Sequence, residues 1–361
     1  MLVVCSCSHV KPYLQTDTPS SIPDAALRAR VILVGDAGRP HAGVLEGVGE
    51  WSTKFADKTA VVFLGDNVYE HGLPAGPAKT EKAALDRQIA SVSSLHGLFI
   101  PGNHDWRAGR KGISRQMTYV ERSSKIRFLP RDGCPGPSSY TPLDGILIIA
   151  VDTQWFLQES ADAAGCDLGE DPILEFSARV QRLLRSAEDR LVVVVAHHPP
   201  WTYGPHGGFY DWRDHLFPLT RLVSWAWIPL PAIGSLYPIA RTLRKHSQDA
   251  FSPPYRKVQR QLADAFAVFD GRGPLIFAGG HDHSLQVIEN RKPWGYVLVS
   301  GSGSTGKLTT VTHGHDTVFA FLAHGFMSID LMDNGSAYLH VIVAGQPDTV
   351  FIHTLRADPA R

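Results

Sequence analysis

The chain has no excess charge of either sign and little cysteine. Thirty-five basic residues balance thirty-five acidic ones, and no basic cluster alternates with aromatic side chains, so we expect no nucleic-acid-binding surface. Four cysteines in 361 residues are too few for a fold built on disulfides. Cys134 and Cys166 lie in polar loops that contain glycine, and they either form a disulfide outside the cytosol or remain two free thiols. We find no internal repeat.

The sequence also lacks a hydrophobic run that suits a membrane-spanning helix. One long apolar stretch without charged residues, Leu222–Ala240, contains three prolines and Gly234, which argue against one continuous helix. This stretch belongs to an apolar insertion at about 211–254. The insertion either packs on the domain as a lid or wall, or makes a membrane-surface contact through residues 217–245, with tryptophans at headgroup depth and flanking basic residues on lipid phosphates.

Short apolar runs predict most of the strands. Early runs alternate with helix-like stretches near Ala78–Val92 and Leu174–Ala187, whereas later runs crowd together. This pattern indicates an α/β (α+β) fold of two mixed β-sheets packed face to face, with helices outside. The strand-like runs are Val31–Val34, Ala60–Leu64, Leu98–Pro101, Ile146–Val151, Leu191–Ala196, Leu275–Ala278, Gln286–Glu289, Tyr296–Val299, Val318–Leu322 and Tyr338–Val343.

Five polar motifs follow predicted strands in a fixed order, and they contain the residues that hold metal ions. Strand-end loops at one edge of an α/β sheet are the usual place for such a site. Any one Gly-Asp pair is most often a turn or a helix cap, but five ordered motifs argue for a joint role. The motifs are Gly-Asp36-Ala-Gly, Gly-Asp66-Asn-Val-Tyr69, Gly-Asn103-His104-Asp105, His197-His198-Pro and Gly-His281-Asp-His283.

These residue types fit a pair of metal ions that cleave a phosphoester. Two ions roughly 3.5–4 Å apart can clamp a phosphoryl group and lower the pKa of a water molecule. Asp66 is the natural carboxylate to bridge them, and the alternation of an extended chain places both rings of His281-x-His283 on one side. His104 is placed to act as an acid toward the phosphate or leaving group, and Asp105 is a candidate to orient it.

The motifs resemble those of the calcineurin-like metallophosphoesterases, and among these the purple acid phosphatases. The usual first motif, Asp-x-His, is missing its histidine, because position 38 is glycine. The purple acid phosphatase pattern opens Gly-Asp-x-Gly and has a tyrosine three residues after the second aspartate, as Tyr69 is here. The resemblance implies one metal on Asp36, Asp66, Tyr69 and His283, and a second on Asp66, Asn103, His197 and His281. His197 is preferred to His198 because it lies two residues before Pro199.

The resemblance also implies the fold, the metals and the reaction. It predicts a four-layer αββα sandwich, iron(III) at the Tyr69 position and iron(II), zinc(II) or manganese(II) at the other, and His206 on the substrate side. The predicted function is a phosphomonoesterase that uses a metal-bound hydroxide on a phosphoester substrate. Phosphodiesterase activity on membrane-borne or nucleotide phosphodiesters is the alternative, and a non-catalytic metal-binding surface protein is the alternative of another class.

Two further motifs are weaker. Gly301–Leu308 nearly matches a phosphate-binding P-loop, but the final Ser/Thr is absent and the following residues favour a strand, so we expect a glycine turn beside the metal site. His313-Gly-His315 favours an exposed hairpin over a metal site.

The ends of the chain suggest a domain plan. Residues 1–28 are expected to be an N-terminal tether or signal remnant, and residues 29–361 one catalytic domain. Leu2-Val3-Val4-Cys5 resembles the end of a bacterial lipoprotein signal, although Val4 stands where a small residue is expected. We therefore expect a periplasmic or lipid-anchored protein, with a cytoplasmic location as the alternative.

Overall fold

The computed structural model describes most of the chain. The described residues are 5–6, 11–15, 25–92, 94, 96–158, 165–221, 225–231, 233–236, 239–241, 246–271, 273–306, 308–346 and 348–358.

The first of two large sheets has seven strands. Its order is β17-β16-β15-β3-β4-β5-β6; the β3-to-β6 half is parallel, and β15 to β17 pair antiparallel. β3 lies between β4 and the much later β15, so the chain returns to complete this sheet near its end. The strands are β3 (Leu27–Val34), β4 (Thr59–Phe63), β5 (His96–Phe99), β6 (Ile126–Phe128), β15 (Gly325–Met332), β16 (Ala337–Val343) and β17 (Phe351–Arg356).

The second sheet has eight strands in the order β2-β14-β12-β13-β11-β9-β8-β7. Its central strands β8, β9, β11 and β13 are parallel, and the outer strands pair antiparallel. The strands are β2 (Tyr13–Leu14), β7 (Ser138–Tyr140), β8 (Ile146–Ala150), β9 (Leu191–Val195), β11 (Ile276–Gly279), β12 (Leu285–Arg291), β13 (Trp294–Ser300) and β14 (Thr317–Phe321).

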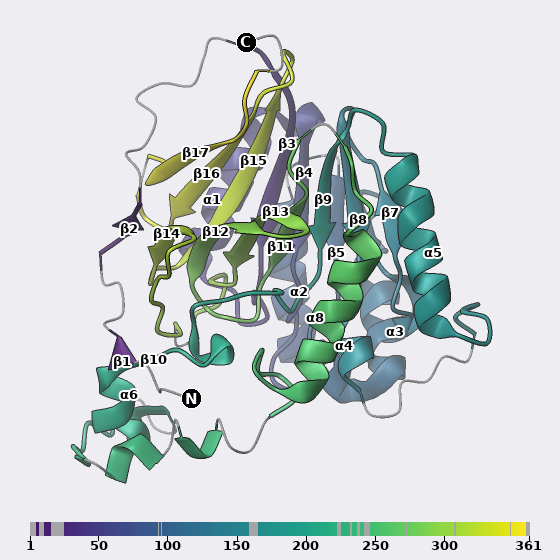
Figure 1. The fold of residues 1–361 in the computed structure, drawn as a ribbon. Coiled ribbons are helices and arrows are strands. Elements are labelled where there is room, and N and C mark those ends of the chain that lie inside the picture. Colours follow the sequence, from purple (N-terminus) through teal and green to yellow (C-terminus); the bar gives the residue numbers. More distant parts are fainter. Residues whose placement is uncertain are drawn as a thin grey trace.

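The two sheets pack face to face between layers of helices, which confirms the predicted αββα sandwich (Figure 1). Val31 and Leu33 point into the core between the sheets, whereas Ile32 and Val34 face the helices on the other side. Both faces of β3 are therefore buried, which explains its continuous apolar run. Helices α1 (Ala42–Lys54), α2 (Lys79–Ser91) and α3 (Gly109–Val120) cover the first sheet; α4 (Thr153–Leu157), α5 (Pro172–Arg185) and α8 (Pro253–Phe266) cover the second.

The N-terminal segment and the apolar insertion meet at one corner. β1 (Cys5–Ser6) pairs in parallel with β10 (Tyr210–Asp211), and β2 adds to the edge of the eight-stranded sheet. Short helices follow β10 in a part of the chain that lies apart from the sheets (Figure 1): α6 (Trp212–Leu216), η5 (Pro218–Arg221) and η6 (Ile233–Ser235). Among the described residues, no helix has the length and apolar character needed to cross a membrane.

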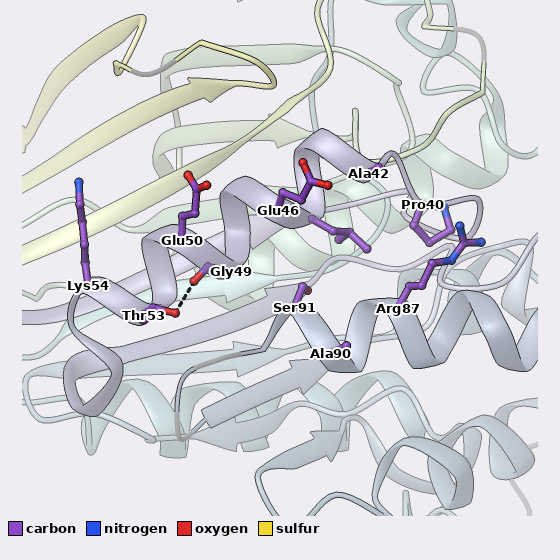
Figure 2. Close-up of a pocket in the computed structure, with 11 residues that line it drawn as sticks. Pro40, Ala42, Glu46, Gly49, Glu50, Thr53, Lys54, Arg87, Ala90 and Ser91 are labelled. Atoms are coloured by element: carbon purple, nitrogen blue, oxygen red, sulfur yellow. Dashed lines mark hydrogen bonds between the residues drawn. The ribbon is translucent and has the colours of Figure 1, made fainter.

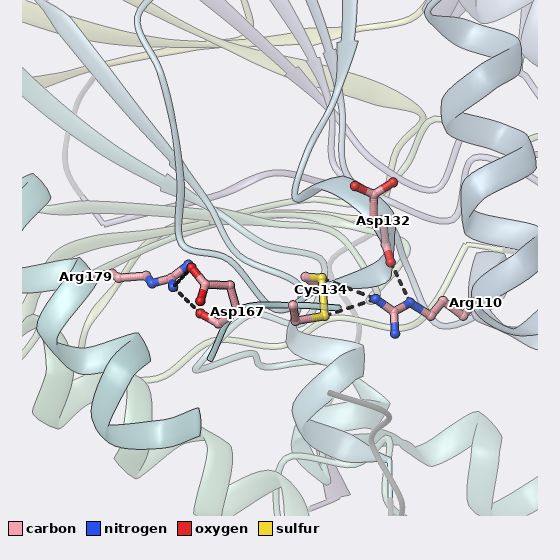
Figure 3. Close-up of a disulfide and its surroundings, with 6 residues drawn as sticks. Arg110, Asp132, Cys134, Asp167 and Arg179 are labelled. Carbon is pink, nitrogen blue, oxygen red and sulfur yellow. Dashed lines mark hydrogen bonds and ion pairs between the residues drawn. A yellow bond between two sulfur atoms is a disulfide. The ribbon is translucent and has the colours of Figure 1, made fainter. Parts of the chain in front are cut away.

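Cys134 and Cys166 form a disulfide, which decides between the two states that the sequence left open. Arg110 lies against the bond, and its Nη2 donates to Cys166 Sγ at 3.1 Å and to Cys134 Sγ at 3.5 Å (Figure 3). Its Nε donates to the carbonyl oxygen of Asp132 at 2.7 Å. The disulfide therefore joins the segment before α5 to the η3 turn (Arg131–Gly133), with an α3 arginine beside it.

Candidate metal centre

The five motifs converge because each follows a parallel strand. Asp36, Asp66 and Asn103 come after β3, β4 and β5 of the seven-stranded sheet, and His197 and His281 come after β9 and β11 of the other sheet. The carboxyl ends of parallel strands meet at one edge of a sheet, and here the two edges lie together. The candidate site therefore straddles both sheets.

Three of these residues have an unusual backbone. Asp36, Asp66 and His281 have φ angles of 59°, 53° and 71°, in the left-handed region that residues other than glycine seldom adopt. Such a conformation costs of order 1–3 kcal/mol per residue and persists only where the surrounding structure enforces it. Neighbouring glycines permit the close packing: a Cβ on Gly102 would lie 2.3 Å from Asp66 Oδ1, and one on Gly280 would lie 2.4 Å from Asp36 Oδ2.

The first group of predicted ligands comprises Asp36, Tyr69 and His283. Tyr69 Oη lies 3.1 Å from Asp36 Oδ1 and 3.2 Å from His283 Nε2, and that nitrogen is 3.4 Å from the same carboxylate oxygen. Gly38 provides the space for Tyr69, since a Cβ at Gly38 would lie 2.9 Å from the tyrosine Cδ2. A histidine at position 38, as in the usual first motif, would therefore clash with the Tyr69 ring.

The second group is Asp66, Asn103 and His197. His197 Nε2 lies 3.0 Å from Asn103 Oδ1 and 3.5 Å from Asp66 Oδ1. Its other ring nitrogen, Nδ1, lies 2.9 Å from the carbonyl oxygen of Leu64. A hydrogen bond from Nδ1 to this carbonyl leaves Nε2 with a free lone pair toward the cluster, as metal-binding histidines require.

His281 and His198 lie beside this group but have other contacts. His281 packs edge-to-face on His197, yet its Nε2 is 2.9 Å from the backbone oxygen of Gln248. Both ring nitrogens of His198 are engaged by side chains, Nδ1 with Thr153 Oγ1 at 2.8 Å and Nε2 with Gln248 Oε1 at 2.7 Å. The geometry therefore favours His197 over His198 as a ligand. No sequence motif pointed to Gln248, which lies at the end of the insertion.

The electrostatics of the cluster suit cations. Burial raises the pKa of Tyr69 well above its usual value, and the charges of Asp36 and Asp66 raise it further, so this phenol ionises only beside a strong positive charge. Burial lowers the pKa of His281 well below the usual value, so the ring stays neutral. Burial also disfavours the charged form of His197, but Asp66 and Asp36 outweigh it and raise its pKa.

The donor set suits metal ions. Ligand atoms of Asp36, Asp66 and His197 all lie within 4.8 Å of one another, as do those of His197, His198 and His281. All five of these residues are buried, where carboxylates and neutral imidazoles need a compensating cation or partner. His/Asp groups of this site could therefore hold metal ions.

His104 and Asp105 have separate positions. The His104 backbone N–H donates to Asp66 Oδ1 at 2.8 Å, its Nε2 lies 3.9 Å from Asp66 Oδ2, and its Nδ1 lies 2.9 Å from the Glu70 carbonyl oxygen. Asp105 is fully buried; its carboxylate accepts from the backbone N–H groups of Asn67, Val68 and Gly102. The carboxylate thus ties the Asp66 loop to the Asn103 loop, and Glu70 is the residue beside the His104 ring.

His206 lies on the other side of His281. The two rings are 3.9 Å apart and tilted by 40°. His206 Nδ1 is 3.0 Å from Asp249 Oδ1 and 3.2 Å from Arg241 Nη2, so these two residues hold the ring by one nitrogen. Asp249 and Arg241 were not predicted, because nothing in the sequence links them to the motifs.

The glycine segment lies beside the metal centre as predicted, but the strand expected after it and the hairpin expected around His313 are not formed, because residues 308–316 contain no strand. Gly301 borders the metal centre, since a Cβ there would lie 2.8 Å from Asp36 Oδ2, and no helix follows it in the described residues up to β14. His313 and His315 are exposed, and His313 stacks on Tyr13 with ring centroids 3.9 Å apart.

Comparison with known proteins identifies the family. The model of the calcineurin-like phosphoesterases matches residues 3–226, more than half of the chain. The chain belongs to the calcineurin-like phosphoesterase family. This family acts on phosphoesters and binds two metal ions. No curated protein matches the sequence.

Solved structures share the fold. One is described as GAP50, the anchor in the inner membrane complex of Plasmodium, with 15% identity, a TM-score of 0.56 and coverage of 91% of this chain and 89% of that one. Another is the purple acid phosphatase PPD1 from yellow lupin seeds, with 13% identity, a TM-score of 0.57 and coverage of 95% of this phosphoesterase. The phosphoesterase spans only 56% of the lupin chain.

A large groove lies elsewhere. It runs between α1 and α2, has a volume of about 830 Å³, and is lined by residues such as Glu46, Glu50, Lys54 and Arg87 (Figure 2). None of its described lining residues belongs to the metal centre. The candidate metal centre therefore does not coincide with this groove.

Proposed function

We propose that this phosphoesterase is a phosphomonoesterase of the purple acid phosphatase type, with iron(III) beside Tyr69 and iron(II), zinc(II) or manganese(II) at the second position. The observation that carries the proposal is the Tyr69 hydroxyl between Asp36 and His283. A phenol with a strongly raised pKa, held by a carboxylate and an imidazole, is a ligand for a hard trivalent cation. The first cation would be held by Asp36, Asp66, Tyr69 and His283, and the second by Asp66, Asn103, His197 and His281.

The residues of the chain supply binding and proton transfer around these ions. The ions, when bound, would lower the pKa of a water molecule and polarise the phosphoryl group. His104 presents Nε2 to the site while Glu70 holds its Nδ1, so a protonated ring can donate to the leaving-group oxygen. His206, fixed by Asp249, offers a second ring to the phosphate. Asp105 is a positioning residue, because its carboxylate fixes the loops that carry Asp66 and Asn103.

A phosphodiester carried by a membrane is the second candidate substrate, and one observation favours it. Large apolar side chains of the insertion are exposed, among them Trp225 and Trp227.

The Cys134–Cys166 disulfide supports an extracytoplasmic location, because disulfides persist in oxidising compartments.

The test measures bound metals, the visible spectrum and turnover. We expect about two metals per chain with iron among them, a visible absorption band, and faster hydrolysis of p-nitrophenyl phosphate than of bis(p-nitrophenyl) phosphate. Tyr69→Phe should lose the band, and Asp66→Asn should lose turnover while keeping the fold. A colourless protein with zinc or manganese and a preference for the diester would refute the purple-type monoesterase and leave the diesterase. Full activity in metal-loaded Asn103→Ala would refute the ligand assignment.

A further inference from the structure

The insertion between the fourth and fifth motifs is a small structured unit, which we name the apolar projection (residues 212–241). The Leu230 backbone N–H donates to the Leu216 carbonyl at 2.8 Å, and the Gly234 N–H donates to the Leu230 carbonyl at 2.7 Å. His215 Nδ1 lies 3.2 Å from Ser235 Oγ. These contacts hold α6 against η6, so the described part of the projection has a defined shape.

The projection exposes apolar side chains that a soluble domain usually buries. Trp225 is 78% exposed, Trp227 57% and Leu236 60%. Most of the exposed large apolar side chains among the described residues lie here, and the others in the projection are Trp212, Ile228, Ile233 and Ile239. Such a concentration marks an interaction surface, and tryptophan prefers the boundary between lipid and water.

The positive charge of this region indicates that its partner is negatively charged. From Trp212 to Gln248 the sequence has five basic residues, of which Arg241 pairs with Asp249, and one acidic residue, Asp214, which is buried. Arg213 is exposed, with its guanidinium 5.6 Å from the centre of the Trp212 ring. Apolar side chains together with one-sided positive charge match a bilayer that contains anionic lipids. A two-fold dimer through the same surface would set these like charges against each other.

We propose that the apolar projection docks this phosphoesterase on an anionic lipid bilayer. The projection is joined directly to the metal centre, since Arg241 at its end bonds Asp249 and His206, and Gln248 reaches His281. Docking would therefore bring the site to phosphoesters carried by lipids. That consequence rests on the proposed function, whereas docking itself does not.

The N-terminal strand supports the same orientation. Cys5 is the β-sheet partner of Tyr210, two residues before the projection begins. β1 therefore lies at the base of the projection. The sequence Leu2-Val3-Val4-Cys5 resembles the end of a lipoprotein signal, and a lipid attached to Cys5 would enter the same bilayer.

Vesicle sedimentation of the full chain tests the proposal. The probes are vesicles of phosphatidylcholine alone and vesicles of equal parts phosphatidylcholine and phosphatidylglycerol. We expect binding to the anionic vesicles that weakens with salt, and about tenfold weaker binding for Trp225→Ser combined with Trp227→Ser. Leu236→Ser should also weaken binding. Leu174→Ser is the matched control, because Leu174 on α5 is 68% exposed but lies outside the projection.

The outcomes separate docking from catalysis. Asp66→Asn should bind vesicles like the parent protein whether or not the protein hydrolyses phosphoesters, and circular dichroism should find every variant folded. The proposal is overturned if the parent protein does not bind anionic vesicles, or if Leu174→Ser loses as much binding as Leu236→Ser. It is also overturned if sedimentation equilibrium finds a dimer that the tryptophan substitutions dissolve, because the projection would then serve self-association.

Discussion

Replacing Gly38 by alanine tests whether the first motif is built around Tyr69. A Cβ at this position would lie 2.8 Å from the carbonyl oxygen of Asp66, 2.8 Å from the backbone nitrogen of Tyr69 and 2.9 Å from its Cδ2. Two of these atoms are backbone, so a side-chain rotation cannot relieve the contact and the Asp66–Tyr69 loop must move. Overpacking of this kind costs about 1–3 kcal/mol in the free energy of unfolding.

The same movement should damage the site. The Tyr69 hydroxyl lies 3.1 Å from Asp36 and 3.2 Å from His283, and a shift of the loop changes both distances. A misplacement of about 1 Å in a catalytic group can cost about a hundredfold in rate. We therefore expect Gly38→Ala to lower kcat/KM for p-nitrophenyl phosphate by about tenfold to a hundredfold and to weaken the visible band.

Urea unfolding of the metal-stripped protein and steady-state kinetics of the loaded protein measure the two effects. The matched control is Gly76→Ala, because Gly76 is exposed and a Cβ there would have no atom within 4 Å. The control should stay within about 0.5 kcal/mol of the parent protein. A Gly38→Ala protein with parental stability, spectrum and kcat/KM would refute the steric argument.

Three further changes have defined outcomes. Asp330→Ala should lower the free energy of unfolding by about 3–5 kcal/mol, because it leaves Arg30 buried without its bidentate partner; a urea-measured loss below about 1 kcal/mol would contradict this. Burial raises the pKa of Asp152 to about 7, so between about pH 4 and 7 the folded protein keeps a proton that the unfolded chain has lost, and stability falls as the pH rises. From about pH 5 to 8 the contribution of Asp152 to this fall should be about 2–3 kcal/mol, and Asp152→Asn should remove it; equal slopes in the two proteins would refute the assignment. Cys134→Ser combined with Cys166→Ser opens a 32-residue connection and should cost about 3–4 kcal/mol, and the idea fails if a reductant leaves the parental melting temperature unchanged.

The strands that the sequence predicted best are those covered on both faces. Val31–Val34 and Leu191–Ala196 are unbroken apolar runs. The first lies within β3 and the second covers β9 and one residue beyond it, and both strands lie between the inner core and a helix layer. β15 was missed although it is central to its sheet. Ser328 and Asp330 interrupt its apolar pattern, but they are buried because Arg30 of β3 binds the carboxylate across the sheet. A pairing partner 300 residues away leaves no local signal.

The candidate site divides in the same way. The ligands predicted by motif lie within a few residues of a strand end, so topology alone brings them together. Gln248, Asp249 and Arg241 reach the site from the end of the insertion, about 40 to 50 residues after His198. Glu70 was also missed, because its contact with His104 is made by its backbone oxygen, which any residue could supply. Contacts made by backbone atoms, or by residues of a long insertion, leave no pattern in the sequence around the motifs.

The place of β3 in its sheet has a consequence for how the protein is made. One neighbour, β4, follows within about 25 residues, but the other, β15, pairs Asp330 with Arg30 at a separation of 300 residues. During synthesis on the ribosome, the strand that leads to Asp36 therefore keeps an unpaired edge until nearly the whole chain has emerged. Open edges of this kind recruit wrong partners, so a nascent chain should depend on chaperones and should aggregate when truncated before Gly325.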